Sequence, residues 1–387
     1  MNSIKLAVAF LLSLSSLNLK AQEFSKCKFR QVIQLNTSAT GAAVKGEVYN
    51  FPLAVVLNEK NFNFSEANRT GSDIRFSKAR DTGMLPHSIE HWDKEKKSAM
   101  IWVKVDHIRG NNPNQLIYMH WGDVAAQDNS DSKIVFNTKE GFVGVWHLSE
   151  TGDTARGHYK DATANLAHGT GVNFKPNSNI DTHLGKGAAF VHAENRWIKI
   201  DGAERKLFDL TNKLTFSIWA LATSYSNKGN EVLKTGPGYE TMFAKGDNSW
   251  RLQKFGLRTW HTPNAELIEI CVEEPPRADL CLVAKTDMVT NKWFHIAAVH
   301  DYPKIRIYVN GVLDNEDTLE TNWKSDDYPV GIGNQSQFPD RGRAWDGILD
   351  EARVYNVPKN EHWIKLDYES QREGQQLLTY GKKEQKF

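Results

Sequence analysis

Short stretches in which apolar and polar residues alternate run through most of this chain, and they constrain its fold more than any other feature. One of them is SAMIWVKVDHI at 98–108, where Ile101, Val103 and Val105 would share one face of a strand. Turn residues separate these stretches, as they do in β-sandwiches and barrels. The pattern therefore predicts an all-β protein.

Two strand-rich regions are separated by a polar, weakly periodic joint near residues 123–140. The second region spans about 230 residues, which suits one large sandwich. The segment 358–373 starts with proline, lacks glycine and predicts a short C-terminal helix. We expect a β-rich domain at 24–135, a second β domain at 140–373 and a tail at 374–387.

The N-terminus is typical of a secretory signal peptide, expected at 1–21. Met1–Lys5 carries one lysine, Leu6–Leu19 is an apolar run with serines, and the small residue Ala21 follows at a plausible cleavage point. The run is too short for a comfortable membrane span, and no later segment has about 18 consecutive apolar residues. We therefore expect a secreted or periplasmic protein without a transmembrane segment.

The charge balance excludes one class of partner. The chain has 48 Lys and Arg against 47 Asp and Glu, a formal net charge of +1. It therefore lacks the single-sign field of a nucleic-acid-binding protein, and we expect no nucleic acid partner. Its 12 Trp residues suit either large β-cores or surfaces that stack on sugar rings, and composition leaves both open.

The chain has three cysteines, Cys27, Cys271 and Cys281. Export permits disulfides, and the segment between Cys271 and Cys281, VEEPPRADL, is typical of a turn between two strands. We expect a disulfide between these two, with two reduced, buried thiols as the alternative. Cys27 is left over and receives no role, and the set has neither the number nor the spacing of a zinc site.

Several segments of the second region occur in an order that resembles a known family: GFVGVWHLSE, DATANLAHGTG, GKGAAFVH, LTFSIWA, KWFHIAAVHD, IRIYVNGVLD and WDGILDEARVYN. They resemble a laminin-G-like jelly-roll domain of the concanavalin-A-like lectin/glucanase superfamily. The upstream segments FPLAVVL, GSDIRFS, LPHSIEHWD, AMIWVKVDHI and IYMHWGD resemble a β-rich domain of unknown function that often precedes such a jelly roll in secreted bacterial proteins. The resemblance implies an N-terminal β-sandwich followed by a concanavalin-A-like jelly-roll sandwich.

One acid stands among aliphatic residues in the last expected strand, GILDEARVYN. Strict alternation would place Asp350 on the same face as Ala352 and Val354. Resemblance puts Asp350 where the superfamily commonly holds a structural calcium ion, with further ligands near Glu150 and Gly187. Calcium prefers such mixtures of carboxylate and carbonyl oxygens. The alternative is that Asp350 accepts backbone N–H bonds and pins the sheet edge.

Neighbouring acids have simpler interpretations. Glu351 would face the other way and pair with a cation such as Arg353. Asp161 opens DATANLAHG, and aspartate favours tight turns because its side chain bonds nearby backbone N–H groups. We prefer a turn role for Asp161, and for Glu150 metal ligation is the lesser interpretation.

Signals for catalysis are missing from the sequence. Glucanases of the superfamily use a Glu-x-Asp-x-x-Glu motif, which sets two acids on one strand face, and Glu-x-Asp occurs nowhere in the chain. His87 and His91 in HSIEH are four residues apart, which is ligand spacing only on a helix. No nucleophile elbow, P-loop or dinucleotide fingerprint is present. We therefore assign no catalytic residue.

Aromatic and basic residues gather in KGDNSWRLQKFGLRTWHTPN at 245–264. Exposed Trp faces can stack on sugar rings while polar neighbours bond the hydroxyls. Trp250, Arg251 and Trp260 are therefore the best ligand-face candidates, with packing against the sheet as the alternative.

These patterns favour a secreted, non-catalytic protein that binds a polysaccharide, another glycan or a cell-surface partner, with structural calcium. One alternative is a glycoside hydrolase or lyase with an unrecognised site. The other is an envelope scaffold or adhesion protein that binds other proteins through a flat apolar patch. The sequence does not define an oligomeric state.

Overall fold

The computed structural model describes residues 24–79, 83–225, 239–246, 249–259, 262–272, 280–320, 325 and 327–385. The chain divides into two compact units. The first combines Met1–Val135 with Glu369–Phe387, and the second is Phe136–Tyr368. Within the described residues, no helix is long and apolar enough to cross a membrane. The expected signal peptide, 1–21, lies outside them.

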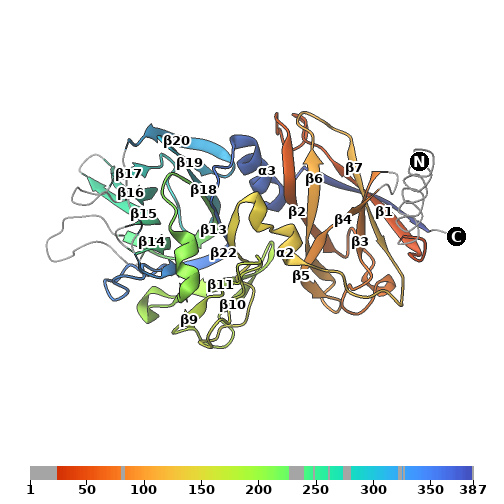
Figure 1. Cartoon of the computed structure of the whole chain (residues 1–387), viewed down its shortest axis with the longest axis horizontal. Helices are drawn as coiled ribbons and strands as arrows, with labels where there is room; N and C mark the ends of the chain where they lie inside the picture. The colour runs from red at the N-terminus through yellow and green to blue at the C-terminus, as the bar shows by residue number, and fades with distance from the viewer. Residues whose placement is uncertain are drawn as a thin grey trace, which may run out of the picture. The chain divides into compact units, whose positions relative to one another are not determined.

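The first unit contains two antiparallel sheets (Figure 1). One has the strand order β23-β1-β7-β3-β4 and the other the order β2-β6-β5. The strands are β1 Phe29–Leu35, β2 Val48–Asn58, β3 Arg75–Lys78, β4 Met84–Leu85, β5 His87–Asp93, β6 Ser98–Ile108, β7 Gln115–Trp121 and β23 Leu378–Gln385. Two short helical segments accompany them, η1 Phe64–Glu66 and α2 Ser132–Val135.

The long pair β2 and β6 forms much of the core of this unit. Their residues are paired from Val48↔Ile108 to Asn58↔Ser98. Ile101, Val103 and Val105 of β6 are between 0% and 2% exposed, and Trp102 on the opposite face of the strand is buried too. Each such side chain contributes about 1.5–3 kcal/mol when it leaves water.

The C-terminal segment belongs to the first unit. Residues 374–387, expected as a tail, contain β23, which pairs antiparallel with β1; Figure 1 draws β23 in blue beside β1 in red. The hydroxyl of Tyr380 donates to the backbone carbonyl of Val56 at 3.0 Å, which links β23 to the other sheet. Strands β1 and β23, far apart in the sequence, are therefore neighbours in one sheet.

The second unit also contains two antiparallel sheets (Figure 1). The eight-stranded sheet has the order β10-β11-β22-β13-β18-β19-β20, with β8 paired to β22, and the seven-stranded sheet has the order β17-β16-β15-β14-β21-β12-β9. The strands are β8 Phe142–Trp146, β9 Thr170–Val172, β10 Asn179–Thr182, β11 Gly185–Phe190, β12 Trp197–Ile200, β13 Lys213–Ala222, β14 Tyr239–Lys245, β15 Trp250–Thr259, β16 Thr262–Val272, β17 Leu280–Val283, β18 Trp293–Asp301, β19 Lys304–Val309, β20 Val312–Thr318, β21 Val330–Ile332 and β22 Gly347–Tyr355. The helical segments are η3 Thr138–Glu140, η4 His192–Glu194, η5 Ala203–Phe208 and α3 Glu361–Gln371.

Strand β13 shows how the eight-stranded sheet uses its two faces. Phe216 and Ile218 point into the hydrophobic core that both sheets share. Ser217 and Trp219 point the other way and are nevertheless buried. Part of α3 covers that outer face, where the ring of Tyr368 stacks on Trp219 with 5.8 Å between ring centroids. The predicted all-β architecture with a short C-terminal helix is confirmed.

Candidate functional site

A β-bulge in β22 decides where the acids of GILDEARVYN point. Two residues of β22 oppose one residue of β13, because the pairing passes from Trp219↔Asp350 to Ser217↔Arg353. Glu351 adopts φ 51°, in the left-handed region that some bulges require. The extra residue puts Ala352 in the core and Asp350 on the outer face. The strict alternation expected from the sequence is therefore wrong here.

The carboxyl group of Asp350 is buried, with the residue 1% exposed. Its Oδ2 accepts a hydrogen bond from Thr182 Oγ1 at 2.8 Å, while Oδ1 makes no well-formed hydrogen bond within the described residues. Burial, followed by the charge of Glu351, raises the pKa of Asp350 well above its usual range. A buried carboxylate that lacks donors is costly, so this position favours either a proton or a bound cation.

The residues expected at the metal site are only partly brought together. A Cβ atom at Gly187 in β11 would lie 3.1 Å from Thr182 Cγ2, and Thr182 bonds Asp350. Glu150 instead accepts a hydrogen bond from the backbone N–H of Lys160 at 2.6 Å through Oε1. Gly187 and Asp350 thus meet around Thr182, and the described contact of Glu150 is with a loop.

Asp161 organises a turn, as the sequence indicated. Its Oδ1 accepts from the backbone N–H groups of Val145 and Thr163 at 3.0 and 2.9 Å. Its Oδ2 accepts from Thr163 Oγ1 at 2.8 Å and from the N–H of Ala167 at 2.9 Å. Four donors satisfy this carboxylate, which explains its burial without a metal.

A chain of buried ion pairs, here called the Arg353 network, lies on the outer face of β22. Glu351 Oε1 lies 2.6 Å from His147 Nδ1, and Glu351 Oε2 accepts from Arg353 Nη2 at 2.7 Å. Arg353 Nη1 donates to Asp367 Oδ1 at 2.8 Å. The other oxygen of Asp367 lies 3.3 Å from His295 Nε2. The expected Glu351–Arg353 pair is confirmed, and His147, Asp367 and His295 extend it.

The acids of the Arg353 network stay ionised although they are buried, because neighbouring cations offset their charges. Burial opposes ionisation of Glu351, but the charges of His147 and Arg353 outweigh it and lower the pKa of that carboxyl group. Burial also opposes ionisation of Asp367, and Arg353 and a hydrogen bond from His295 lower its pKa in the same way. These acids are therefore structural anions held by cations.

The aromatic ligand-face candidates are placed differently from the expectation. Trp250 is 0% exposed within the core, its Nε1 donates to the carbonyl of Phe208 at 3.1 Å, and its ring lies 4.4 Å from that of Phe216. A ring enclosed in the core cannot stack on a sugar, so Trp250 is corrected to a packing role. Arg251 is only 2% exposed, and Trp260 lies outside the described residues.

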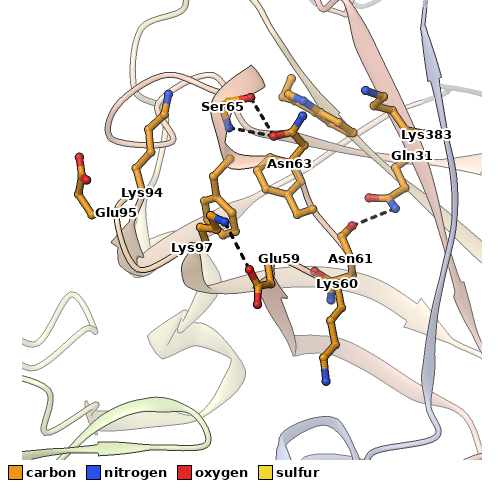
Figure 2. A pocket seen from close by; sticks show the side chains of 13 residues that line it. Gln31, Glu59, Lys60, Asn61, Asn63, Ser65, Lys94, Glu95, Lys97 and Lys383 are labelled. Carbon is orange, nitrogen blue, oxygen red and sulfur yellow. Dashed lines mark hydrogen bonds and ion pairs between the residues drawn. The ribbon is translucent and has the colours of Figure 1, made fainter.

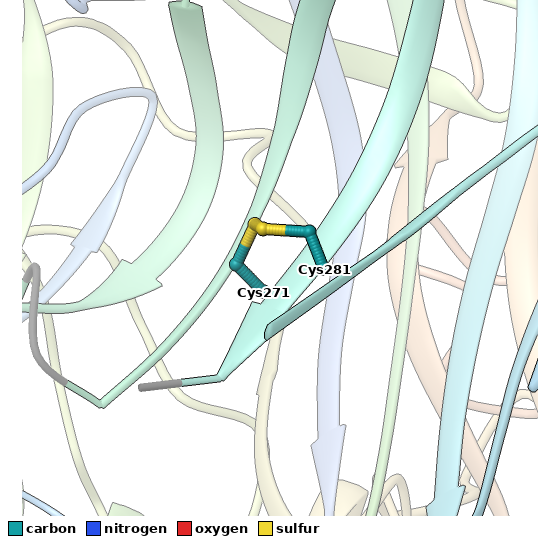
Figure 3. Close-up of a disulfide and its surroundings, with 2 residues drawn as sticks. All are labelled: Cys271 and Cys281. Atoms are coloured by element: carbon teal, nitrogen blue, oxygen red, sulfur yellow. A yellow bond between two sulfur atoms is a disulfide. The ribbon is translucent and has the colours of Figure 1, made fainter. Parts of the chain in front are cut away.

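Cys271 and Cys281 form the expected disulfide (Figure 3). They face each other directly across β16 and β17, with Cα atoms 4.1 Å apart. The disulfide covalently links β17, the edge strand of the seven-stranded sheet, to its neighbour β16. Cys27 is buried in the first unit and takes no part in it.

The two histidines of HSIEH lie on strand β5, so their spacing does not bring them together as it would on a helix. His91 Nε2 lies 3.1 Å from Ser98 Oγ. His87 is 2% exposed, with its ring 5.5 Å from that of Phe76. Burial, and secondarily the charge of Arg75, lowers the pKa of His87 from 6.5 to about 4.

Two known families match the chain. Residues 193–365 match the Concanavalin A-like lectin/glucanases superfamily, and residues 70–149 match a domain of unknown function, DUF2341. The predicted pairing of a laminin-G-like jelly roll with an upstream domain of unknown function is therefore confirmed. No curated protein matches the chain.

Similar solved structures cover 60% of the chain at low identity. The binding domain of Paraclostridial Mosquitocidal Protein 1 is 15% identical with a TM-score of 0.45, over 52% of that chain. The receptor binding domain of botulinum neurotoxin mosaic serotype C/D is 14% identical with a TM-score of 0.43, over 51%. Domain 4 of AbnA, a GH43 extracellular arabinanase from Geobacillus stearothermophilus, solved with arabinotriose, is 16% identical with a TM-score of 0.39, over 98%. The chain thus spans about half the length of the two toxin chains.

Replacing Arg353 by alanine is expected to lower the free energy of unfolding by about 3–5 kcal/mol, because it leaves Glu351 and Asp367 buried without their shared cation. Urea denaturation measures this. Arg306→Ala is the matched control, since its pair with Glu316 is solvent-exposed and contributes about 0–1 kcal/mol. Equal losses in the two variants would contradict a structural role for the Arg353 network.

Acid is expected to destabilise the first unit through His87. Because the unfolded chain binds a proton near pH 6.5 and the folded state only near pH 4, stability present above pH 6.5 is lost as the pH falls through this window, by about 3 kcal/mol. His87→Gln should flatten that part of the pH dependence, measured by urea denaturation at several pH values. An unchanged slope in the variant would show that His87 is not the group responsible.

Proposed function

We propose that this chain is a secreted or periplasmic recognition protein whose jelly roll binds glycans without cleaving them. The superfamily match at 193–365 supports a binding role. The signal-like N-terminus supports export. The Cys271–Cys281 disulfide is consistent with an oxidising compartment.

The observation that carries the non-catalytic part is the Arg353 network. A glycosidase needs two carboxyl groups that face the same sugar ring from opposite sides. The acids Glu351 and Asp367 are each 1% exposed and are bound to cations. Together with the lack of a Glu-x-Asp motif, this supports a structural role for Glu351 of β22 and Asp367 of α3.

Calcium is part of the proposal, and the residues at Asp350 fit it. The carboxylate oxygen Oδ1 is buried and makes no well-formed hydrogen bond with the described residues, and hard cations such as calcium take carboxylate and carbonyl oxygens. Asp350 would supply that oxygen, and the backbone near Gly187 would supply carbonyl groups. A bound calcium ion would neutralise the carboxylate and stiffen β22 against β11, which pair from Leu349↔Ala188 to Gly347↔Phe190.

Binding of the mature chain to an array of immobilised glycans, with calcium or with a chelator, tests the function. We expect binding to at least one glycan class, weaker in chelator because the unliganded Asp350 region loosens. Lack of binding in both conditions would overturn the glycan proposal in favour of protein partners. Turnover of a polysaccharide that disappears in Glu351→Gln would overturn the non-catalytic proposal.

The melting temperature with and without calcium tests the metal site separately. Calcium should raise it in the wild-type chain but not in Asp350→Asn, which removes a ligand charge while keeping the shape of the side chain. Asp317→Asn, at an exposed position of β20, should keep the full response. An equal calcium response in the wild type and in Asp350→Asn would remove Asp350 from the site.

A further inference from the structure

We propose that the first unit holds a second binding site, for an acidic oligosaccharide that contains uronic acid residues. The site is a pocket of about 650 Å³ (Figure 2), within the size range of small-molecule sites. It lies where β1 and β7 meet the segment after β2 and the turn between β5 and β6. Its lining comes from Gln31, Trp121, the stretch 59–65, the turn residues Lys94, Glu95 and Lys97, and Lys383 of β23.

Two buried side-chain atoms of the lining residues, Gln31 Oε1 and Trp121 Nε1, have no hydrogen-bond partner within the described residues. Gln31 is 6% exposed, and its Nε2 donates to the carbonyl groups of Asn61 and Gly381 at 3.2 and 2.9 Å. These bonds fix the amide and leave Oε1 as an unsatisfied acceptor. Trp121 is 1% exposed, and its Nε1–H is an unsatisfied donor. Buried polar groups are nearly always hydrogen-bonded, so the pair indicates a ligand that brings both a hydroxyl and an acceptor oxygen.

Aromatic packing holds these groups in place. The ring of Phe62 lies 5.0 Å from both Trp121 and Phe64, and Phe64 lies 5.1 Å from Trp92. All four rings belong to the first unit, and Phe62, Phe64 and Trp121 are at most 6% exposed. The polar groups of the pocket therefore stand on a rigid apolar base, as pre-organised binding sites require.

The charged side chains that line the pocket include more cations than anions. Four lysines line the pocket against two glutamates; with Glu66, which pairs with Lys383 from outside the lining, the excess is one positive charge. Lys97 lies 3.4 Å from Glu59, Lys383 pairs with Glu66 outside the lining, and Lys94 donates to the carbonyl of Ala67 at 2.7 Å. Figure 2 shows Gln31 and Lys383 at one side of the pocket and Lys94 and Glu95 at the other, with Asn63 and Lys97 between them.

This arrangement selects a ligand class. Ammonium groups only donate, so they favour a carboxylate, whereas Gln31 Oε1 requires a hydroxyl. A uronic acid residue carries both on one ring, and a neutral sugar lacks the carboxylate. The site is in the first unit and does not rest on the proposed function of the jelly roll.

Calorimetric titration of the full mature chain with a galacturonic acid trimer, in chelator, tests the site. We expect saturable binding that weakens as salt rises from about 50 mM to about 500 mM, because salt screens the lysine charges. The neutral galactose trimer should bind at least about tenfold more weakly. Citrate should also bind weakly, since it lacks the ring hydroxyls. Equal binding of the neutral trimer, or no binding of the acidic one, would overturn the proposal.

Substitutions locate the binding. Trp121→Phe keeps the aromatic base but removes the donor, and should weaken binding about three- to tenfold. Lys97→Gln, at an exposed position whose surface pair with Glu59 contributes about 0–1 kcal/mol, should weaken it about two- to fivefold. Lys45→Gln, an exposed lysine of the same unit away from the pocket, should leave it unchanged. Equal affinities for Lys97→Gln and Lys45→Gln would contradict the site.

The two proposals can fail separately. Asp350→Asn should not change binding of the acidic trimer in chelator, because the pocket contains no residue of the second unit. Lys97→Gln should not change the calcium response of the melting temperature. If Asp350→Asn abolishes binding of the acidic trimer while the chain stays folded, the ligand binds outside this pocket.

Discussion

The guanidinium group of Arg353 holds two carboxylates, one from its own strand and one from α3, where water is excluded. A charge buried alone costs several kcal/mol, so each member of the network is stable only when the others are in place. His147 follows β8, His295 lies on β18 and Asp367 on α3. The requirement for neutrality thus ties three strands and the helix into one arrangement, and it explains why α3 covers that face of the sheet.

The bulge in β22 is the local device that makes this arrangement possible. A regular strand would have sent Asp350 and Glu351 to opposite faces. The left-handed conformation of Glu351 places both acids on the outer face. Glu351 then meets cations, while Asp350 accepts a hydrogen bond from Thr182 and keeps an oxygen that suits a metal ion. One extra residue in β22 therefore gives the adjacent acids Asp350 and Glu351 different partners.

The two units present polar groups in different ways. In the second unit, the charges of the Arg353 network balance one another, Asp350 is the buried acid for which a cation is proposed, and Trp250 lies in the core. In the first unit, Gln31 Oε1 and Trp121 Nε1 are buried in residues that line a pocket, and neither atom has a hydrogen-bond partner among the described residues. A buried network whose hydrogen bonds are all formed stabilises a fold. An unpaired donor and acceptor at a pocket can instead form hydrogen bonds with a ligand. The further site is assigned to the first unit because the two residues with unsatisfied atoms line a pocket there.

The sequence by itself determined the all-β class, the C-terminal helix, the disulfide and the Glu351–Arg353 pair, because strand alternation, turn residues and short-range charge pairing act over a few neighbouring residues. Only the tertiary structure decided the bulge, the burial of Trp250, and the contacts of Asp367 with Arg353 and with His295. Asp367 sits between Leu366 and Tyr368 in the helix, an acid within an apolar stripe, but its partner lies on another element. Such contacts join residues far apart in the chain, and their energies depend on burial, which no local pattern records.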